Sequence, residues 1–185
     1  MFMRGEILLI LAVIFIVGCQ VNETYKIVDL PLLEEQEEVD NMKLTSSAFE
    51  HNGDIPEEFT CDDADISPPL AIEEASENAK SLALIMDDPD APVGTFVHWV
   101  VWNIDPTTTE IKKGEQIPWP QGRTDFGKQG YGGPCPPGGT HRYFFKLYAL
   151  DTKLDLQPRS TKRDLERAME GHIIEKAELM GKYSR

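Results

Sequence analysis

The stretch "YGGPCPPGGTHRYFFKLYAL", residues 131–150, decides the fold. Its first ten residues contain four glycines, three prolines and one cysteine, which is the composition of an irregular loop. The aromatic and apolar residues that follow predict a β-strand over His141–Asp151. Because strand side chains alternate between the two faces of a sheet, we expect His141 and Tyr143 on one face and Arg142 on the other.

Two further segments predict strands of the same kind. Ser81–Asp87, "SLALIMD", is a compact apolar run bounded by polar residues, as expected of a buried strand. Thr95–Asp105, "TFVHWVVWNID", is rich in β-branched and aromatic residues, which favour strands. Simple alternation along this second strand predicts that His98, Val100 and Trp102 share one face.

The C-terminal segment has a different period. Its helical spacing runs through Leu165, Ala168, Met169, His172, Ile173, Lys176 and Met180. Ser160 or Thr161 can cap the start, and Gly181 stands where a terminating glycine is common. We therefore predict a helix over Thr161–Met180, with His172 as a packing residue, although Gly171 inside it costs about 1 kcal/mol relative to alanine. The predicted fold is mainly β with a C-terminal α-helix.

The composition is that of a soluble globular domain with a strong negative charge. The chain has 185 residues, of which 41% are hydrophobic, and this length is sufficient for one domain with a sizeable core. Lys and Arg total 18 against 32 Asp and Glu, which gives a formal net charge of −14. This charge argues against nucleic acid as a partner, because nucleic-acid binding depends on neutralising phosphates with basic residues.

The N-terminus is typical of an export signal. Ile7–Val17 is an unbroken apolar run that would span about 16 Å as a helix, roughly half of a bilayer core. That length indicates a signal peptide rather than a permanent membrane span. The run ends in "IVGC", Ile16–Cys19, which resembles the lipobox of prokaryotic lipoproteins, where the cysteine is lipidated. An ordinary secretory signal and an uncleaved anchor are the alternatives. All three place the domain outside the cytoplasm. The expected location is the extracytoplasmic face of the cell envelope with a lipid anchor, and secretion is the alternative.

The chain therefore divides into three predicted parts. Residues 1–18 are the signal peptide, residues 19–42 are the lipidated Cys19 with an acidic linker, and residues 43–185 are the folded domain. Two cysteines remain in the domain, Cys61 and Cys135. In an oxidising compartment they can form a disulfide, which would contribute about 4 kcal/mol in the chain-entropy model. A disulfide and two free thiols both stay open.

Two of the four histidines lie in predicted strands, and two acids stand near the end of another. His98 and His141 are the strand histidines, while His51 in the polar "EHNGD" is expected to be solvated. "DDPDAP" places Asp88 and Asp90 in a proline-fixed turn after the buried strand. Carboxylates beside imidazoles hold the rings in orientation and raise the pKa of the histidines. We therefore expect Asp88 and Asp90 to support the two imidazoles.

Three motifs occur in an order that identifies a family. "DPDAP" at 88–92, "HWVVWNI" at 98–104 and "GPCPPGGTHRYFFKLYALD" at 133–151 resemble the phosphatidylethanolamine-binding proteins. The similarity is to the prokaryotic branch, often called Raf-kinase-inhibitor-like. "IPEEFTCDDADISPPL" at 55–70 and the ending "AMEGHIIEKAELMGKYSR" at 168–185 are also similar to that branch. The resemblance covers roughly residues 42–185.

The resemblance implies a β-sandwich-like fold of antiparallel sheets with a small pocket at one end. In this family the pocket binds a phosphate-type anion, such as a phospholipid head group or a phosphorylated residue, and needs neither a cofactor nor a metal. Matched by motif, the implied ligand-binding residues are Asp88, Asp90, His98, Gly133, Pro136, Pro137, His141 and Tyr143. Cys135 departs from the animal branch, which has glycine at that position.

The hydrogen-bond donors among these residues are compatible with an anion pocket. Protonated His98 and His141, the Tyr143 hydroxyl and the backbone N–H groups of a glycine-rich loop are donors that do not depend on net charge. The predicted function is an envelope-anchored binding protein for phosphate-type groups, with a protein partner that it modulates as a further expectation.

Three alternatives to this function stay open. A cysteine-dependent hydrolase or transferase could use Cys135 and His141, since a cysteine near a histidine can be a nucleophile. A zinc or iron site could use His98, His141 and Asp88. The third alternative is an inhibitor of an extracytoplasmic enzyme.

Overall fold

The computed structural model describes residues 41–185. The predicted signal peptide, the lipidation site at Cys19 and nearly all of the acidic linker lie outside these residues. Within residues 41–185, no helix is long and apolar enough to cross a membrane.

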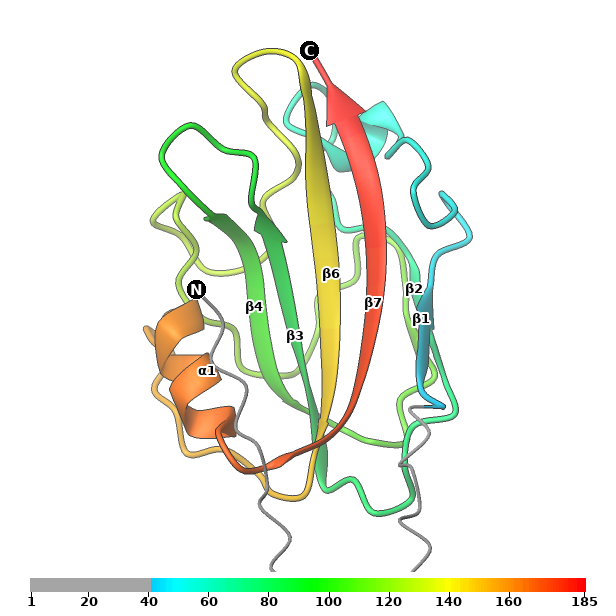
Figure 1. The fold of residues 1–185 in the computed structure, drawn as a ribbon, viewed down its shortest axis with the longest axis vertical. Helices are drawn as coiled ribbons and strands as arrows, with labels where there is room; N and C mark the ends of the chain where they lie inside the picture. Colours follow the sequence, from blue (N-terminus) through cyan, green and yellow to red (C-terminus); the bar gives the residue numbers. More distant parts are fainter. Residues whose placement is uncertain (1–40) are drawn as a thin grey trace, which may run out of the picture. The chain divides into compact units, whose positions relative to one another are not determined.

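Nine elements make up the described domain (Figure 1). They are β1 (Lys43–Thr45), the 3-10 helix η1 (Glu57–Phe59), β2 (Leu70–Glu73), β3 (Ser81–Asp88), β4 (Phe96–Ile104), β5 (Glu110–Ile111), β6 (Thr140–Leu150), α1 (Lys162–Met169) and β7 (Ile173–Ser184). The three strong strands predicted from the sequence are confirmed as β3, β4 and β6, each within one residue of its expected ends.

The strands form two antiparallel sheets. One has the order β1-β2-β5 and the other the order β4-β3-β6-β7. The main core lies between the sheets, where Leu44 and Ile72 of the small sheet join Leu84 and Phe145 of the large one. Every residue of β3 is buried, which explains its apolar run. The predicted mainly β, antiparallel, sandwich-like fold is confirmed.

The helix α1 covers the outer face of the large sheet. Leu165 and Met169 pack there against Val100 and Trp102 of β4, and α1 lies beside β4 in Figure 1. Thr161 caps the start, because its hydroxyl accepts from the backbone N–H of Asp164 while the Asp164 carboxylate accepts from the backbone N–H of Thr161. This is one of the two N-caps expected from the sequence.

The predicted helix over Thr161–Met180 is wrong in its second half. The chain leaves the helix at Met169 and passes through Gly171, whose φ of 78° lies in the left-handed region that glycine favours. Residues 173–184 then form β7 and pair with the whole length of β6. His172 is consequently exposed and bonded to Asp151 at 2.8 Å, instead of packing on a helix.

The predicted alternation along β4 is also wrong at the histidine. Val97 pairs with Asp87 and Trp99 pairs with Met86, so His98 is the extra residue of a β-bulge. Val100 and Trp102 therefore face α1, while His98 lies against the ring of Tyr143 on the other side of the sheet. The bulge directs His98 towards the end of the molecule where β6 begins.

Candidate functional site

A pocket of about 270 Å³ lies where three segments meet. These are the turn after β3, the start of β4 and the glycine- and proline-rich loop before β6. The lining residues are Asp88, Ala91, Pro92, Val93, Phe96, His98, Phe126, Cys135, Pro136, Pro137 and His141. Five of the eight ligand-binding residues expected from the family are among them, and Asp90, Gly133 and Tyr143 are not.

His141 is held by Asp88. The Nδ1 atom of His141 lies 2.7 Å from the Oδ2 atom of Asp88, and both side chains are buried. Since a carboxylate accepts, Nδ1 carries the proton in this bond and Nε2 is the ring nitrogen left for the pocket. The expectation that an acid orients an imidazole agrees with this pair.

His98 is held by a backbone carbonyl instead of an acid. Its Nδ1 atom donates to the Gly132 oxygen at 2.7 Å, because a carbonyl can only accept. The rings of Phe96, Phe126 and Tyr143 surround it with centroids at 5.2 Å. Burial lowers the pKa of His98, against the raising effects of the Gly132 carbonyl and the Asp88 charge. The expectation that neighbouring carboxylates raise the pKa of His98 is therefore wrong in sign.

The three acids of "DDPD" take three different partners. Asp87 is fully buried and bonds the Nζ atoms of Lys146 at 2.8 Å and Lys162 at 2.5 Å. Asp88 bonds His141. Asp90 accepts from the Arg142 guanidinium at 2.7 and 2.8 Å, and these hydrogen bonds lower the pKa of Asp90 to about 2.

The expectation that Asp90 supports an imidazole is therefore wrong. Arg142 follows His141 and points to the opposite face of β6, so its guanidinium reaches Asp90 where the imidazole cannot. The contribution of Asp90 to the site is indirect. Its backbone N–H donates to the Oδ1 atom of Asp88 at 2.8 Å, which fixes the carboxylate that holds His141.

Tyr143 lies directly behind the pocket wall. Its ring meets His98 edge to face, and its hydroxyl is buried without a hydrogen-bond partner of good geometry among residues 41–185. Burial raises the pKa of Tyr143, with the charge of Asp88 as the next cause. A buried hydroxyl without a partner is uncommon, because the loss of its hydrogen bonds costs about 1–3 kcal/mol.

The loop before β6 is fixed by a disulfide. The structure joins Cys61 to Cys135 with an S–S distance of 2.04 Å, and the backbone N–H of Cys61 donates to the Pro134 oxygen at 3.1 Å. Gly133 packs so closely that a Cβ atom there would lie 2.4 Å from the Phe59 oxygen. Gly133 therefore holds the loop against the segment after η1 and does not itself line the pocket.

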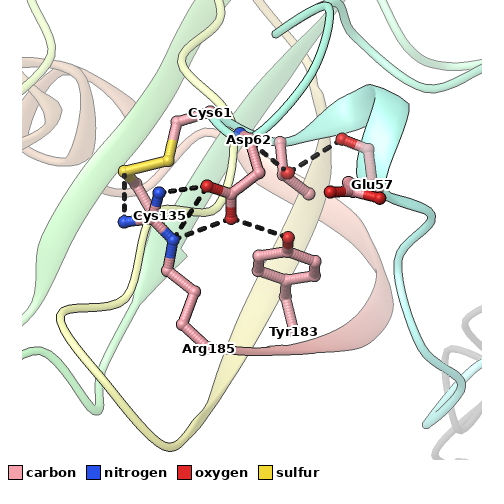
Figure 2. A network of polar contacts seen from close by, with 7 residues as sticks. Glu57, Cys61, Asp62, Cys135, Tyr183 and Arg185 are labelled. Carbon is pink, nitrogen blue, oxygen red and sulfur yellow. Dashed lines mark hydrogen bonds and ion pairs between the residues drawn. A yellow bond between two sulfur atoms is a disulfide. The ribbon is translucent and has the colours of Figure 1, made fainter.

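The end of the chain reinforces the same loop (Figure 2). Asp62 accepts from the Tyr183 hydroxyl at 2.7 Å and from the Arg185 guanidinium, whose Nη1 atom lies 3.7 Å from the Cys135 sulfur. The Arg185 backbone also exchanges hydrogen bonds with Gly139. These contacts tie β7 and the segment after η1 to the loop that forms one wall of the pocket.

Sequence reasoning missed the apolar rim of the pocket. Val93 and Phe126 are 85% and 40% exposed, and they are the two large hydrophobic side chains exposed within residues 41–185. Both line the pocket. The signal was present for Phe126, because it is a lone aromatic residue in the otherwise polar "GRTDFGKQG".

The geometry of the site affects two of the alternative functions, the cysteine-dependent enzyme and the metal site. The Cys135 sulfur is bonded to Cys61, so in this form it is not the thiolate that a cysteine nucleophile requires. Within residues 41–185, no three His, Cys, Asp or Glu side chains are grouped to hold a metal ion. His98 and His141 are brought together at the pocket, while His51 and His172 are exposed elsewhere on the surface.

Comparisons with known proteins agree with the motifs. A family model described as phosphatidylethanolamine-binding protein matches residues 45–184. The UPF0098 protein PH1269 of Pyrococcus horikoshii is 53% identical over 149 residues, which cover 76% of this chain and 75% of that protein.

Two solved structures share the fold. CT736 of Chlamydia trachomatis, described as a phosphatidylethanolamine-binding protein homologue, is 44% identical with a TM-score of 0.77, over 79% of this chain and 99% of that one. E. coli YbcL, described as a member of the mammalian PEBP family, is 31% identical with a TM-score of 0.73, over 78% and 98%.

Proposed function

The chain belongs to the phosphatidylethanolamine-binding protein family, and from this premise we propose that it is a binding protein whose pocket holds a small phosphate-type anion. A phospholipid head group and a phosphorylated small molecule are both ligands of this chemistry. The proposal concerns the pocket formed by the turn after β3, the start of β4 and the loop before β6.

One observation carries the proposal. His98 and His141 come from different strands, each uses Nδ1 in a hydrogen bond to the protein, and both line the same pocket. This leaves the two Nε2 atoms as the polar groups that a ligand can meet. The hydroxyl of Tyr143 is buried next to His98 and has no hydrogen-bond partner of good geometry among residues 41–185, so a bound water can satisfy it.

Charge in the pocket is balanced locally despite the net charge of −14. Asp88 is committed to His141 and Asp90 to Arg142, so neither carboxylate is left unpaired to repel an anion. The pair of protonated His141 and ionised Asp88 is neutral and still presents an Nε2–H donor. A small anion can therefore bind through short-range donors in a protein of strongly negative charge.

The rim fits the organic part of such a ligand. Val93 and Phe126 are exposed and line the pocket, and Pro136 and Pro137 also line it. Burial of apolar surface against them favours a ligand with carbon atoms attached to the anionic group, at about 25 cal/mol per Å².

The proposed function is tested by phosphate binding to paired variants. We expect calorimetry to show that the protein binds O-phosphoethanolamine at pH 6 and that His141→Ala weakens binding roughly 10- to 100-fold, as expected for a charge-assisted hydrogen bond. His172→Ala is the matched control, because His172 forms a similar pair with Asp151 on the exposed surface.

Equal affinities for the wild type and His141→Ala would reject the pocket as the binding site. Circular dichroism of each variant establishes that it is folded. Absence of binding by the wild-type protein at millimolar ligand would reject the proposed function itself.

A further inference from the structure

We propose that the pocket selects phosphate monoesters over phosphate diesters, because the ligand must bring a proton to His98. This inference rests on the proposed function and narrows the ligand class for the same pocket. It follows from which ring nitrogens carry protons and from the groups that face them.

The first step is the tautomer of His98. Its Nδ1 atom lies 2.7 Å from the Gly132 oxygen, and a carbonyl oxygen has no proton to give. Nδ1 must therefore be the protonated nitrogen. In the neutral ring Nε2 then has a free lone pair, so it is a hydrogen-bond acceptor.

The second step is that the surroundings keep the His98 ring neutral. Three aromatic rings meet it edge to face, and only 2% of the residue is exposed. The ionised groups that act on it are Asp88 and, more weakly, Asp87, and neither forms a hydrogen bond with the ring. Asp88 is paired with His141 and Asp87 with two lysines, so their charges are largely balanced.

The third step concerns the hydrogen bond that orients His141 and the groups around this ring. Its Nδ1–H donates to the Asp88 carboxylate, so an Nε2–H donor on this ring would form a neutral pair with the adjacent negative charge. Around it, Arg142 is paired with Asp90, and Tyr183 is its cross-strand neighbour on β7. The polar face of the pocket therefore offers an acceptor at His98 Nε2 and a donor at His141 Nε2–H.

The complementary ligand carries one hydroxyl next to an anionic oxygen. A phosphate monoester has this form as its monoanion, because its second pKa is about 6. Its P–O–H can donate to His98 while its anionic oxygen accepts from His141. A phosphate diester has no ionisable hydroxyl left, so it would place an anionic oxygen against the lone pair of His98 or force that buried ring to become charged.

The test compares two ligands that differ in this feature. Calorimetry at pH 6 measures O-phosphoethanolamine, a monoester, against glycerophosphoethanolamine, its diester counterpart. We expect the monoester to bind at least about tenfold more tightly, which is the lower range for one unsatisfied buried polar group. At pH 7.5, titrations in two buffers of different ionisation enthalpy should show uptake of about one proton or more per monoester bound.

The variant His98→Gln tests whether His98 causes the selectivity. His98→Gln replaces the acceptor nitrogen with an amide that can also donate, so the preference for the monoester should fall to less than about threefold. His172→Gln should keep the wild-type ratio, because His172 lies on the exposed surface away from the pocket. If His98→Gln does not fold, the wild-type affinity ratio and proton uptake decide the matter.

The outcomes separate the two proposals. A diester that binds as tightly as the monoester, or monoester binding at pH 7.5 without proton uptake, would overturn the inference and leave the anion pocket intact. Full selectivity in folded His98→Gln would also overturn it. Failure of both ligands to bind would overturn the proposed function as well.

Discussion

Asp88 is the residue on which the geometry of the site depends. Its carboxylate accepts from His141 through one oxygen and from the backbone of Asp90 through the other. The same side chain thus fixes the imidazole and the turn that forms one wall of the pocket. A second Asp–His pair, Asp151 with His172, has nearly the same distance but lies on the exposed surface.

The two pairs give a matched prediction. Asp88→Asn should lower the free energy of unfolding by about 1–3 kcal/mol, because the amide has one acceptor oxygen for the two donors, His141 Nδ1–H and the Asp90 N–H, that the carboxylate accepts from. Asp151→Asn should change it by less than about 1 kcal/mol, since exposed ion pairs contribute little. Urea unfolding at pH 7 measures both variants, and equal losses would show that burial does not distinguish the two pairs.

His98 predicts a pH dependence of stability. Its pKa in the folded protein is lowered by burial, so below about 6.5 the unfolded chain binds a proton that the folded chain does not. The stabilisation is present above the unfolded pKa and is lost as the pH falls below it, by at most about 1 kcal/mol between pH 7 and 5.5.

Urea unfolding of the wild type and His98→Gln across this range tests the assignment. The wild type should lose more stability than the variant as the pH falls. Parallel pH profiles would contradict a neutral, buried His98.

At this scale, five of the eight residues expected from the motifs line the pocket, but local patterns do not predict their contacts. The motifs indicated the residues, and His98 and His141 do share a pocket. The bulge that turns His98 depends on pairing between β3 and β4, and the Asp90–Arg142 pair depends on which face of β6 each side chain takes. Both are tertiary features that local patterns do not specify.

At the scale of elements, the loop of residues 131–139 acts as a fixed wall. The disulfide, the close packing of Gly133 and the contacts of Arg185 fasten it at three points. The composition alone indicates an irregular loop, whereas in the structure its glycines and prolines have separate roles. Pro136 and Pro137 line the pocket, while Gly133 packs on the segment after η1.

Two glycines of this loop form a test. Gly133→Ala places a Cβ atom 2.4 Å from the Phe59 oxygen and 2.8 Å from the Thr60 Cα atom, so we expect a loss of about 1–3 kcal/mol in unfolding free energy. Gly138→Ala meets no atom within 4 Å and should leave stability nearly unchanged. Thermal unfolding of the two variants checks this, and equal melting temperatures would mean that the loop is not packed as described.

The last element shows the limit of local patterns. Residues after 169 fit a helical spacing, yet they form β7, which pairs with β6 along the whole length of that strand. A pattern typical of a strand is also present in this segment. Ala177, Leu179 and Tyr183 pack against the main core and Gly181 is buried, and these residues alternate with Glu178, Met180 and Lys182. The same residues fit both the strand period of two and the helical period of 3.6. Pairing with β6 makes the segment a strand.

At the scale of the whole molecule, the apolar run at Ile7–Val17 predicts an export signal. We propose that Cys19 is lipidated and anchors the domain to the outer side of the cell membrane. Cys19→Ala should move the protein from the membrane fraction to the soluble fraction, while Cys61→Ala should not. Membrane retention of Cys19→Ala would contradict lipid anchoring at that residue.

The central claim is that a phosphate-type group binds between His98 and His141. The chain has four histidines, so long-range ¹H–¹⁵N NMR of the imidazoles during a titration with O-phosphoethanolamine observes the two pocket rings and two internal controls together. We predict saturable shifts of the Nε2 signals of His98 and His141, with His51 and His172 unchanged. Shifts confined to His51 or His172, or none in the pocket pair, would contradict the account.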